Sequence, residues 1–132
     1  MEGIQKKIAV LNDLSGYGRC SLTAAMPVIS ALTVQCCPVV TAVLSNHAGY
    51  PECYMDDYTD RMEAYLEPWR KMGFEMDGIM TGFLGSARQV SIVADFIRDF
   101  KRENTQVLVD PTMGDHGHLY SCLLYTSDAA DE

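Results

Sequence analysis

The chain has 132 residues, of which 48% are hydrophobic and 21% charged, a composition typical of a globular protein and not of a disordered or collagen-like one. Acidic residues outnumber basic ones and give a net charge of −8; because phosphate neutralisation drives nucleic-acid binding, we expect no nucleic-acid partner. No apolar run approaches the roughly 20 residues that cross a bilayer, and the first residues lack the features of a signal peptide. These features predict a soluble, cytoplasmic domain, or part of one, without a membrane partner.

The cysteines have no metal-binding spacing. Their number is odd, and two of them are adjacent within an apolar run, which does not support a zinc ribbon. We therefore expect reduced thiols, as is usual in the cytoplasm. The five cysteines are Cys20, Cys36, Cys37, Cys53 and Cys122.

The first part of the chain predicts a strand, a helix and a second strand. The apolar run 7–11 predicts a buried strand that ends at Asn12 and Asp13 and leads into a tight loop. From Ser21 onward apolar residues follow helical spacing, and Pro27 predicts a kink or a delayed start of this helix. The spaced apolar residues are Leu22, Ala25, Ile29 and Leu32. Residues 39–44 then predict a strand that ends at a polar cluster.

The second part repeats the alternation. One apolar face over 58–69 predicts an amphipathic helix that stops at Gly73, and residues 78–81 predict a short strand. Ser86 and Gln89 have the spacing of a capping box, which predicts the start of another helix. The buried stripe expected for that helix is Val90, Val93, Ile97 and Phe100. Residues 106–109 predict a further strand, so the whole pattern indicates an α/β fold with a largely parallel sheet.

Each of the four predicted strands ends in a small or polar cluster. The clusters span residues 13–18, 45–50, 82–86 and 110–115. In open α/β sheets, ligands bind outside the carboxyl ends of the strands, where loop amides and helix N-termini converge. The pattern therefore predicts one site assembled from four loops that are far apart in sequence.

Three segments carry groups suited to ligand binding. Gly16, Gly18 and Ser21 nearly match a dinucleotide-binding fingerprint, but the third glycine and the acidic residue after the second strand are missing, which favours a plain strand-to-helix turn over NAD binding. Residues 45–50 offer hydroxyl, amide and imidazole groups that could hydrogen-bond a polar heteroaromatic ring. Asp110 and Asp115 present hard oxygen ligands suited to Mg²⁺, or else form a solvated turn.

Two features of the C-terminal part are set apart from the site. His116 and His118 are interpreted as loop residues, because two histidines without a third ligand make a poor metal site. Residues 122–132 resemble the translated read-through of a sequencing adapter, so we expect the native sequence to end near residue 121.

Four of these segments together resemble the pyridoxal/pyridoxine/pyridoxamine kinases of the ribokinase-like superfamily, and most of all the bacterial pyridoxamine kinases. The segments are Asn12–Gly18, Ser45–Tyr50, Thr81–Ser86 and Val109–Asp115, in the same order as in the family. The resemblance implies a three-layer α/β sandwich with a largely parallel central sheet, of which residues 1–121 form the N-terminal half.

The resemblance also implies roles for individual residues. Either Asp13 or Ser15 meets the polar edge of the vitamin ring, and an aromatic residue packs near that ring. The residues matched to the substrate pocket are Asp13, Ser15, His47, Ala48, Tyr50 and Phe83. Asp110 and Asp115 match carboxylates on the side of the pocket that binds ATP and Mg²⁺.

The implied reaction is the transfer of the ATP γ-phosphoryl group to the 5′-hydroxymethyl group of a B6 vitamer by a homodimeric enzyme. In the family the base is an aspartate of a later Gly-x-Gly-Asp loop, which is absent from this sequence. A positioned base contributes roughly 10²–10⁴-fold to such reactions, so we expect the chain alone to be inactive. The alternatives are a hydroxymethylpyrimidine kinase of thiamine synthesis and a non-catalytic vitamer-binding domain.

Overall fold

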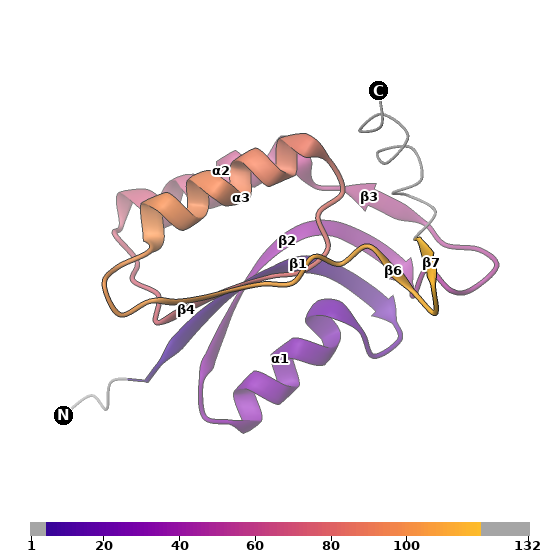
Figure 1. Cartoon of the computed structure of the whole chain (residues 1–132), viewed down its shortest axis with the longest axis horizontal. Coiled ribbons are helices and arrows are strands. Elements are labelled where there is room, and N and C mark those ends of the chain that lie inside the picture. Colours follow the sequence, from indigo (N-terminus) through magenta and orange to yellow (C-terminus); the bar gives the residue numbers. More distant parts are fainter. Residues whose placement is uncertain (1–4, 120–132) are drawn as a thin grey trace.

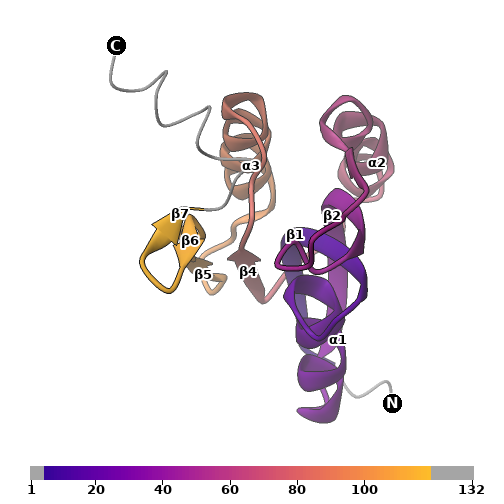
Figure 2. The same ribbon diagram turned by 90° about the vertical axis from the view of Figure 1, so that its right-hand side faces the viewer.

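The computed structural model describes residues 5–119. Its elements form three layers, with helix α1 (Ser21–Ala31) on one side of a central sheet and helices α2 (Thr59–Lys71) and α3 (Ala87–Phe100) on the other (Figures 1 and 2). The three-layer α/β architecture is therefore confirmed. The segment 122–132, which the sequence sets apart as non-native, lies outside the described residues.

The central sheet has five strands in the order β3-β2-β1-β4-β5. Strands β1 (Lys7–Tyr17), β2 (Gln35–Asn46), β4 (Gly78–Thr81) and β5 (Gln106–Val109) pair in parallel. The three-residue strand β3 (Met55–Asp57) runs antiparallel to β2 at one edge. The largely parallel sheet is thus confirmed, while β3 was not predicted because three residues carry no readable alternation.

Strand β1 is longer than the apolar run 7–11 predicts. Its backbone pairs with β2 as far as Tyr17, with an irregularity between Asn12 and Leu14. The expected end at Asn12 is therefore wrong, because the polar residues that follow stay in the strand. On its other side β1 pairs with β4 over Ile8–Leu11 alone. Beyond Leu11 the sheet therefore has a step, at which β4 stops and β1 and β2 continue.

Helix α1 covers part of one face of the sheet. It begins at Ser21 and continues past Pro27, so the expected delayed start is wrong. Leu22 and Ile29 are buried against Val10, whereas Leu32 is 68% exposed because it lies beyond the end of the helix.

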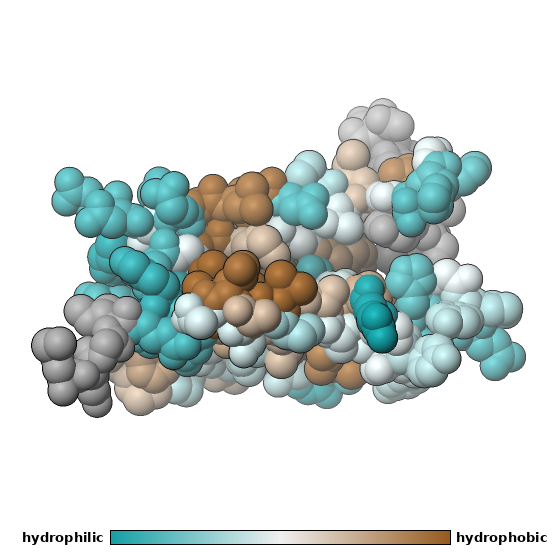
Figure 3. Space-filling model, turned by 90° about the horizontal axis from the view of Figure 1, so that it is seen from below, coloured by the Kyte–Doolittle hydropathy of each residue, from teal (hydrophilic) through white to brown (hydrophobic). Residues whose placement is uncertain are grey.

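The face of the sheet on the α1 side remains partly open. Met80 packs toward α1 and Val107 toward the opposite core, so the alternation of a strand turns Leu108 toward the α1 side. Leu108 pairs with Met80 and is 61% exposed. Figure 3, seen from below Figure 1, shows apolar residues gathered on this side of the molecule.

The main core lies between the sheet and helices α2 and α3. Its aromatic part centres on Trp69, whose ring contacts Tyr65, Phe96 and Phe100. Helix α2 spans Thr59–Lys71, close to the predicted 58–69, and ends before Gly73 as predicted. No helix within residues 5–119 is long and apolar enough to cross a membrane.

The buried stripe of α3 differs from the predicted one. Val90 is 54% exposed and Gln89 is fully buried, the reverse of what hydrophobicity alone predicts, because the Gln89 side chain forms internal hydrogen bonds that are described below. The residues of α3 that are buried are Gln89, Ile92, Val93, Phe96 and Phe100.

The last described segment is a small hairpin. Strands β6 (Gly114–Asp115) and β7 (His118–Leu119) pair antiparallel. Between them, His116 and Gly117 have φ values of 49° and 79°, as a two-residue type I′ turn requires. The interpretation of His118 as a loop residue is therefore wrong, since it lies in a strand.

Candidate functional site

A pocket of about 690 Å³ lies at the carboxyl end of the sheet. All four predicted loops contribute to its lining, which confirms that the four strand exits converge on one site. The residues from the sequence-based site that line it are Asp13, Ser15, His47, Ala48, Tyr50, Phe83 and Asp115. Asp110 is not in the lining.

Asp13 is the most deeply placed charged group of the pocket. Asp13 is only 7% exposed to solvent. Each carboxylate oxygen accepts a hydrogen bond from a serine hydroxyl, Oδ1 from Ser21 at 2.5 Å and Oδ2 from Ser15 at 3.2 Å. Ser21 has a φ of 50°, a left-handed conformation that residues with a Cβ rarely adopt. The turn from β1 into α1 is thus shaped around the Asp13 carboxylate.

Asn12 joins the exit of β1 to the exit of β4. Its Oδ1 accepts hydrogen bonds from the backbone N–H of Asp13 and of Phe83, each at 2.9 Å. A Cβ at Gly82 would lie 2.4 Å from the Asn12 Cγ, so only glycine fits there. The pairing of β1 with β4 stops at Leu11. Beyond that point the Asn12 side chain makes the connection to the loop after β4 and thereby positions Phe83.

The loop after β2 forms the opposite wall. The His47 N–H donates to the Tyr17 carbonyl at 2.9 Å, which ties this loop to the end of β1. The Gly49 N–H donates to His47 Nδ1 at 2.9 Å, so the neutral imidazole carries its proton on Nε2 and can donate there. The Tyr50 ring meets the Tyr17 ring edge to face, with centroids 5.8 Å apart.

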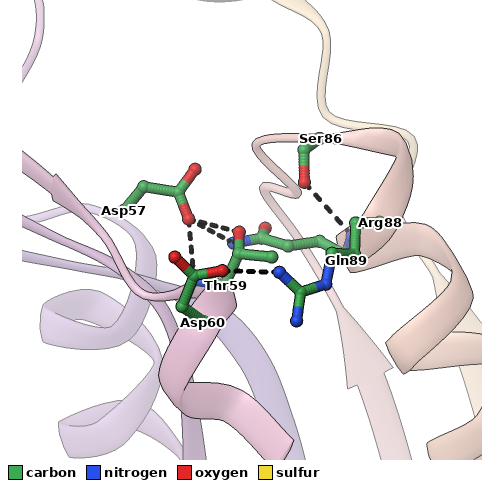
Figure 4. A network of polar contacts seen from close by, with 6 residues as sticks. All are labelled: Asp57, Thr59, Asp60, Ser86, Arg88 and Gln89. Carbon is green, nitrogen blue, oxygen red and sulfur yellow. Dashed lines mark hydrogen bonds and ion pairs between the residues drawn. The ribbon is translucent and has the colours of Figure 1, made fainter.

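A buried polar network supports the loop that carries Phe83 (Figure 4). The Gln89 Oε1 accepts from the Gly85 N–H at 2.7 Å, and its Nε2 donates to the Thr41 carbonyl at 2.8 Å and to Thr59 Oγ1 at 2.9 Å. The Thr41 hydroxyl in turn donates to the Phe83 carbonyl at 2.9 Å. The loop after β4 is thereby held to strand β2 and to the start of α2.

The predicted capping box is half correct. The Ser86 hydroxyl accepts from the Gln89 N–H at 3.2 Å, as expected. The Gln89 side chain does not return to Ser86, because it bonds to Gly85 and to the groups of the network instead. The helix start was therefore predicted correctly, and the role of the Gln89 side chain was not.

The acidic loop contributes one carboxylate to the pocket. Asp115 is exposed, and its Oδ1 accepts from the His116 N–H at 2.9 Å. Asp110 is also exposed and lies outside the lining. No group of three or more His, Cys, Asp or Glu side chains that could hold a metal ion occurs within residues 5–119. Asp115 alone fits a Mg²⁺ ion that keeps several waters and also binds phosphate oxygens.

Several lining residues were not among the predicted site residues. Ser21 starts the helix after β1, and a strand-to-helix turn at a sheet edge is a signal that could have indicated it. Thr112 precedes the hairpin and His118 pairs with Asp115 across it, whereas nothing in the sequence indicates Cys53 or Met55. The lining residues missed include Cys20, Ser21, Cys53, Met55, Thr112 and His118.

Comparisons with known proteins agree on one group of relatives. No protein-family model matches the chain. The pyridoxine/pyridoxal/pyridoxamine kinase of Bordetella avium is 32% identical over 107 residues, which cover 77% of this chain and 36% of that protein. A structure from Bacteroides thetaiotaomicron, provisionally named a phosphomethylpyrimidine kinase and crystallised with pyridoxal, is 48% identical with a TM-score of 0.86; the match covers 89% of this chain and 41% of that one.

A third relative shares the fold at lower identity. The pyridoxal kinase of Leishmania donovani, solved in complex with ADP and pyridoxamine, is 22% identical with a TM-score of 0.82. The match covers 88% of this chain and 44% of that one. In each of these three comparisons the chain spans less than half the length of its relative.

A mostly parallel sheet between two helical layers, with a pocket at its carboxyl edge, is the arrangement in which open α/β proteins bind small molecules. The named relatives are kinases of small molecules. The chain belongs to the ribokinase-like family that includes the pyridoxal kinases.

Proposed function

We propose that the protein containing this sequence phosphorylates a B6 vitamer, transferring the γ-phosphoryl group of ATP to the 5′-hydroxymethyl group. The observation that carries this proposal is a pocket at the sheet step, lined by residues of all four matched segments. Similarity supports it: the 48% identical Bacteroides structure was crystallised with pyridoxal, and the Bordetella relative is named for the three vitamers.

The pocket offers both kinds of contact that a B6 ring needs. Phe83 and Tyr50 supply aromatic surface for the ring faces, and the adjacent Ala48 leaves room beside them. We assign the polar edge of the ring to Asp13, which Ser15 orients. His47 is oriented by Gly49 to donate from Nε2. Hydrogen bonds of this kind orient a ligand in an otherwise apolar site.

The nucleotide side of the pocket is assigned to the acidic loop. The Leishmania relative was solved with ADP, and Asp115 is the carboxylate that the hairpin brings to the pocket. Bound Mg²⁺ would neutralise phosphate charge during transfer, and Asp115 would hold it through its carboxylate, of which Oδ2 lies 3.7 Å from His116 Nε2. A role for Asp110 in the same site stays a prediction.

The printed sequence contains no Gly-x-Gly-Asp segment. We therefore propose that residues 1–132 alone do not turn over, since a general base contributes roughly 10²–10⁴-fold. Three further predictions belong to this proposal: residues 1–121 are part of the kinase domain and 122–132 are not, the active protein is a homodimer, and it works in the cytoplasm. The four described cysteines, Cys20, Cys36, Cys37 and Cys53, are free thiols.

The decisive experiment is a phosphorylation assay of the intact protein that contains this sequence. Pyridoxal, pyridoxine and pyridoxamine are each incubated with ATP and Mg²⁺, and the 5′-phosphate product is measured. Hydroxymethylpyrimidine is assayed in parallel, because the Bacteroides relative is named for the chemistry of that substrate class. We expect turnover of at least one vitamer and a much lower kcat/KM for the pyrimidine.

Each result has a distinct meaning. Faster turnover of the pyrimidine than of any vitamer would favour the second candidate, a hydroxymethylpyrimidine kinase. Vitamer binding without any phosphorylation would indicate a binding protein, and the absence of both would refute the proposal. Asp115→Asn serves as the internal check, since the assignment to Mg²⁺ predicts that this variant needs more Mg²⁺ for half-maximal rate.

A further inference from the structure

A glutamine without exposed surface lies behind the wall of the pocket. Gln89 is fully buried, and neither it nor its partner Thr41 is part of the pocket lining. Removing an amide from water is costly unless hydrogen bonds replace those that water made. An apolar side chain of similar shape would avoid that cost, so what Gln89 contributes lies in the groups that its amide joins.

Hydrogen bonds surround the Gln89 amide (Figure 4). Its Oε1 accepts from the Gly85 N–H at 2.7 Å, and its Nε2 donates to the Thr41 carbonyl at 2.8 Å. Nε2 also lies 2.9 Å from Thr59 Oγ1 and 3.2 Å from Asp57 Oδ1, so its two protons face three acceptors. One side chain of α3 therefore connects the loop after β4 with β2, with β3 and with the start of α2.

These contacts lead to two different walls of the pocket. The Thr41 hydroxyl donates to the Phe83 carbonyl at 2.9 Å, and Phe83 lines the pocket. Asp57 ends the strand β3 that Met55 begins, and Met55 also lines the pocket. Gln89 therefore links the wall that carries Phe83 to the wall that carries Met55.

Backbone pairing does not link these two walls. In the described sheet, β2 and β1 lie between β3 and β4, and the pairing of β4 with β1 stops at Thr81. Beyond that point both backbone groups of Phe83 bond to side chains, its N–H to Asn12 Oδ1 and its carbonyl to the Thr41 hydroxyl. The separation of the two walls therefore depends on side chains, and a shift of about 1 Å in such a wall can be costly for a bound reactant.

We infer that Thr41 and Gln89 are positioning residues for substrate binding: they hold Phe83 at a fixed distance from the β3 wall, so that the pocket is formed before the vitamer binds. The inference rests on the proposed function and adds to it the groups outside the pocket that set the affinity for the vitamer. Asp115, assigned to the nucleotide, bonds to His116 within its own hairpin. Loss of the network should therefore raise the KM for the vitamer and not the KM for ATP.

The test compares two buried threonines in steady-state kinetics of the intact protein, with ATP and the B6 vitamer that the wild type phosphorylates fastest. Thr41→Val keeps the shape of the side chain and removes the hydroxyl that holds the Phe83 carbonyl. Thr105→Val is the matched control, because the buried Thr105 hydroxyl donates to the Met76 carbonyl at 2.8 Å, ahead of β5 at the other end of the sheet. We expect Thr41→Val to raise the vitamer KM about 5- to 30-fold, as a buried carbonyl without its donor would, and to leave kcat within about twofold. Thr105→Val should change neither KM.

Variants of Gln89 test the other half of the link. Gln89→Glu keeps an acceptor for the Gly85 N–H and loses the donor to the Thr41 carbonyl, whereas Gln89→Met loses both. We expect each to raise the vitamer KM at an unchanged KM for ATP. Hydrogen exchange at the Gly85 N–H should be faster in Gln89→Met than in the wild type, a measurement that needs no substrate. Arg88→Ala, at the exposed neighbouring position, should change neither KM nor the exchange rate, and Thr41→Val decides alone if the Gln89 variants do not fold.

The outcomes distinguish this inference from the proposed function. A purely structural role would lower the folded fraction, and hence kcat, to a similar degree in Thr41→Val and Thr105→Val, with both KM values as in the wild type. That result overturns the inference and leaves the kinase proposal standing. An equal rise of the KM values for vitamer and ATP in Thr41→Val would also overturn it. If the wild type phosphorylates no vitamer, the proposed function fails, and the inference that rests on it fails too.

Discussion

The two ends of the sheet are built differently. At the amino end the strands start in line: Lys7 pairs with Gln35, and Gly78 pairs with both Ile8 and Gln106. At the carboxyl end β4 and β5 stop early while β1 and β2 continue. The even end is closed by backbone hydrogen bonds between neighbouring strands, and the stepped end leaves room for a pocket.

The step changes which atoms hold the structure together. Where β1 loses its neighbour β4, the side chain of Asn12 takes the Phe83 N–H, and Gln89 with Thr41 holds the loop that follows. At the even end, backbone groups make the equivalent ties, such as the Gln106 N–H to the Asp77 carbonyl at 2.9 Å. Substitutions should therefore have larger effects at the stepped end, and those effects should reach the pocket.

The largest effect is expected from Gln89→Ala. The Gln89 side chain is fully buried and bonds to Gly85, Thr41 and Thr59, so its loss removes these three hydrogen bonds and leaves the Gly85 N–H without its acceptor. We expect the free energy of unfolding to fall by about 3 kcal/mol, within the range for unsatisfied buried groups. Urea unfolding followed by circular dichroism measures this change.

The neighbouring residue provides the matched control. Arg88 and Asp60 form an ion pair whose side chains are 61% and 85% exposed, beside the same network (Figure 4). Exposed pairs contribute roughly 0–1 kcal/mol, so Arg88→Ala should change stability little. Equal losses in the two variants would show that the buried network is not what holds this end of the sheet.

A smaller effect is expected from Asn12→Ala. It removes the acceptor of the Asp13 and Phe83 N–H groups, and we expect a loss of about 2 kcal/mol for these half-buried donors. Because Phe83 lines the pocket, vitamer affinity should fall as well. Fluorescence titration with a vitamer and thermal unfolding together check both parts.

Asn46 is the comparison for Asn12. It is the last residue of strand β2, and its amide donates to the exposed carbonyls of His47 and Glu52, which water can satisfy. Asn46→Ala should therefore cost less stability than Asn12→Ala. A larger loss for Asn46 would contradict the role of Asn12 as the substitute for strand pairing.

Much of the fold follows from apolar periodicity. Helix α2, strands β4 and β5 and the start of α3 lie where the pattern predicts them. The extension of β1 was missed because Asp13 and Ser15 are polar, although they continue the alternation of Leu11 and are buried like it. Polarity indicated a loop, whereas backbone pairing with β2 kept the strand.

The location of the candidate site could be predicted from the sequence, but most of the contacts within it could not. Convergence of four strand exits follows from the parallel topology alone. The buried position of Gln89 could not be predicted, because its partners Thr41 and Thr59 are 48 and 30 residues away in the sequence. Asp110 and Asp115 look equivalent in the sequence, but of the two only Asp115 lines the pocket.

A third and smaller effect is expected from Gly16→Ala. A Cβ at Gly16 would lie 2.8 Å from the Ser45 carbonyl oxygen, so β1 and β2 must separate slightly where they extend past the step. We expect a loss of about 1 kcal/mol, at the low end for overpacking, with weaker vitamer binding because His47 follows Ser45. The comparison variant is Gly73→Ala. Gly73 has a φ of 63° and no atom lies within 4 Å of the added Cβ, so this variant measures backbone strain in the absence of a steric clash. Unchanged affinity in Gly16→Ala would show that the wall tolerates the shift.

The smallest effect is expected at the even end and depends on pH. The Lys7 N–H donates to Asp77 Oδ2 at 2.9 Å, and this backbone hydrogen bond holds the pKa of Asp77 below its ordinary value of 3.8. A carboxyl whose pKa is lowered by folding stabilises the fold above its unfolded pKa, and that contribution is lost as the pH falls through the folded pKa. We expect wild type to lose slightly more stability than Asp77→Asn between pH 5 and pH 3, about the ordinary pKa, in urea titrations at each pH. Because the Asp77 side chain is 43% exposed, the difference should stay well below that of Asn12→Ala, and a larger one would mean that this end also depends on a single side chain.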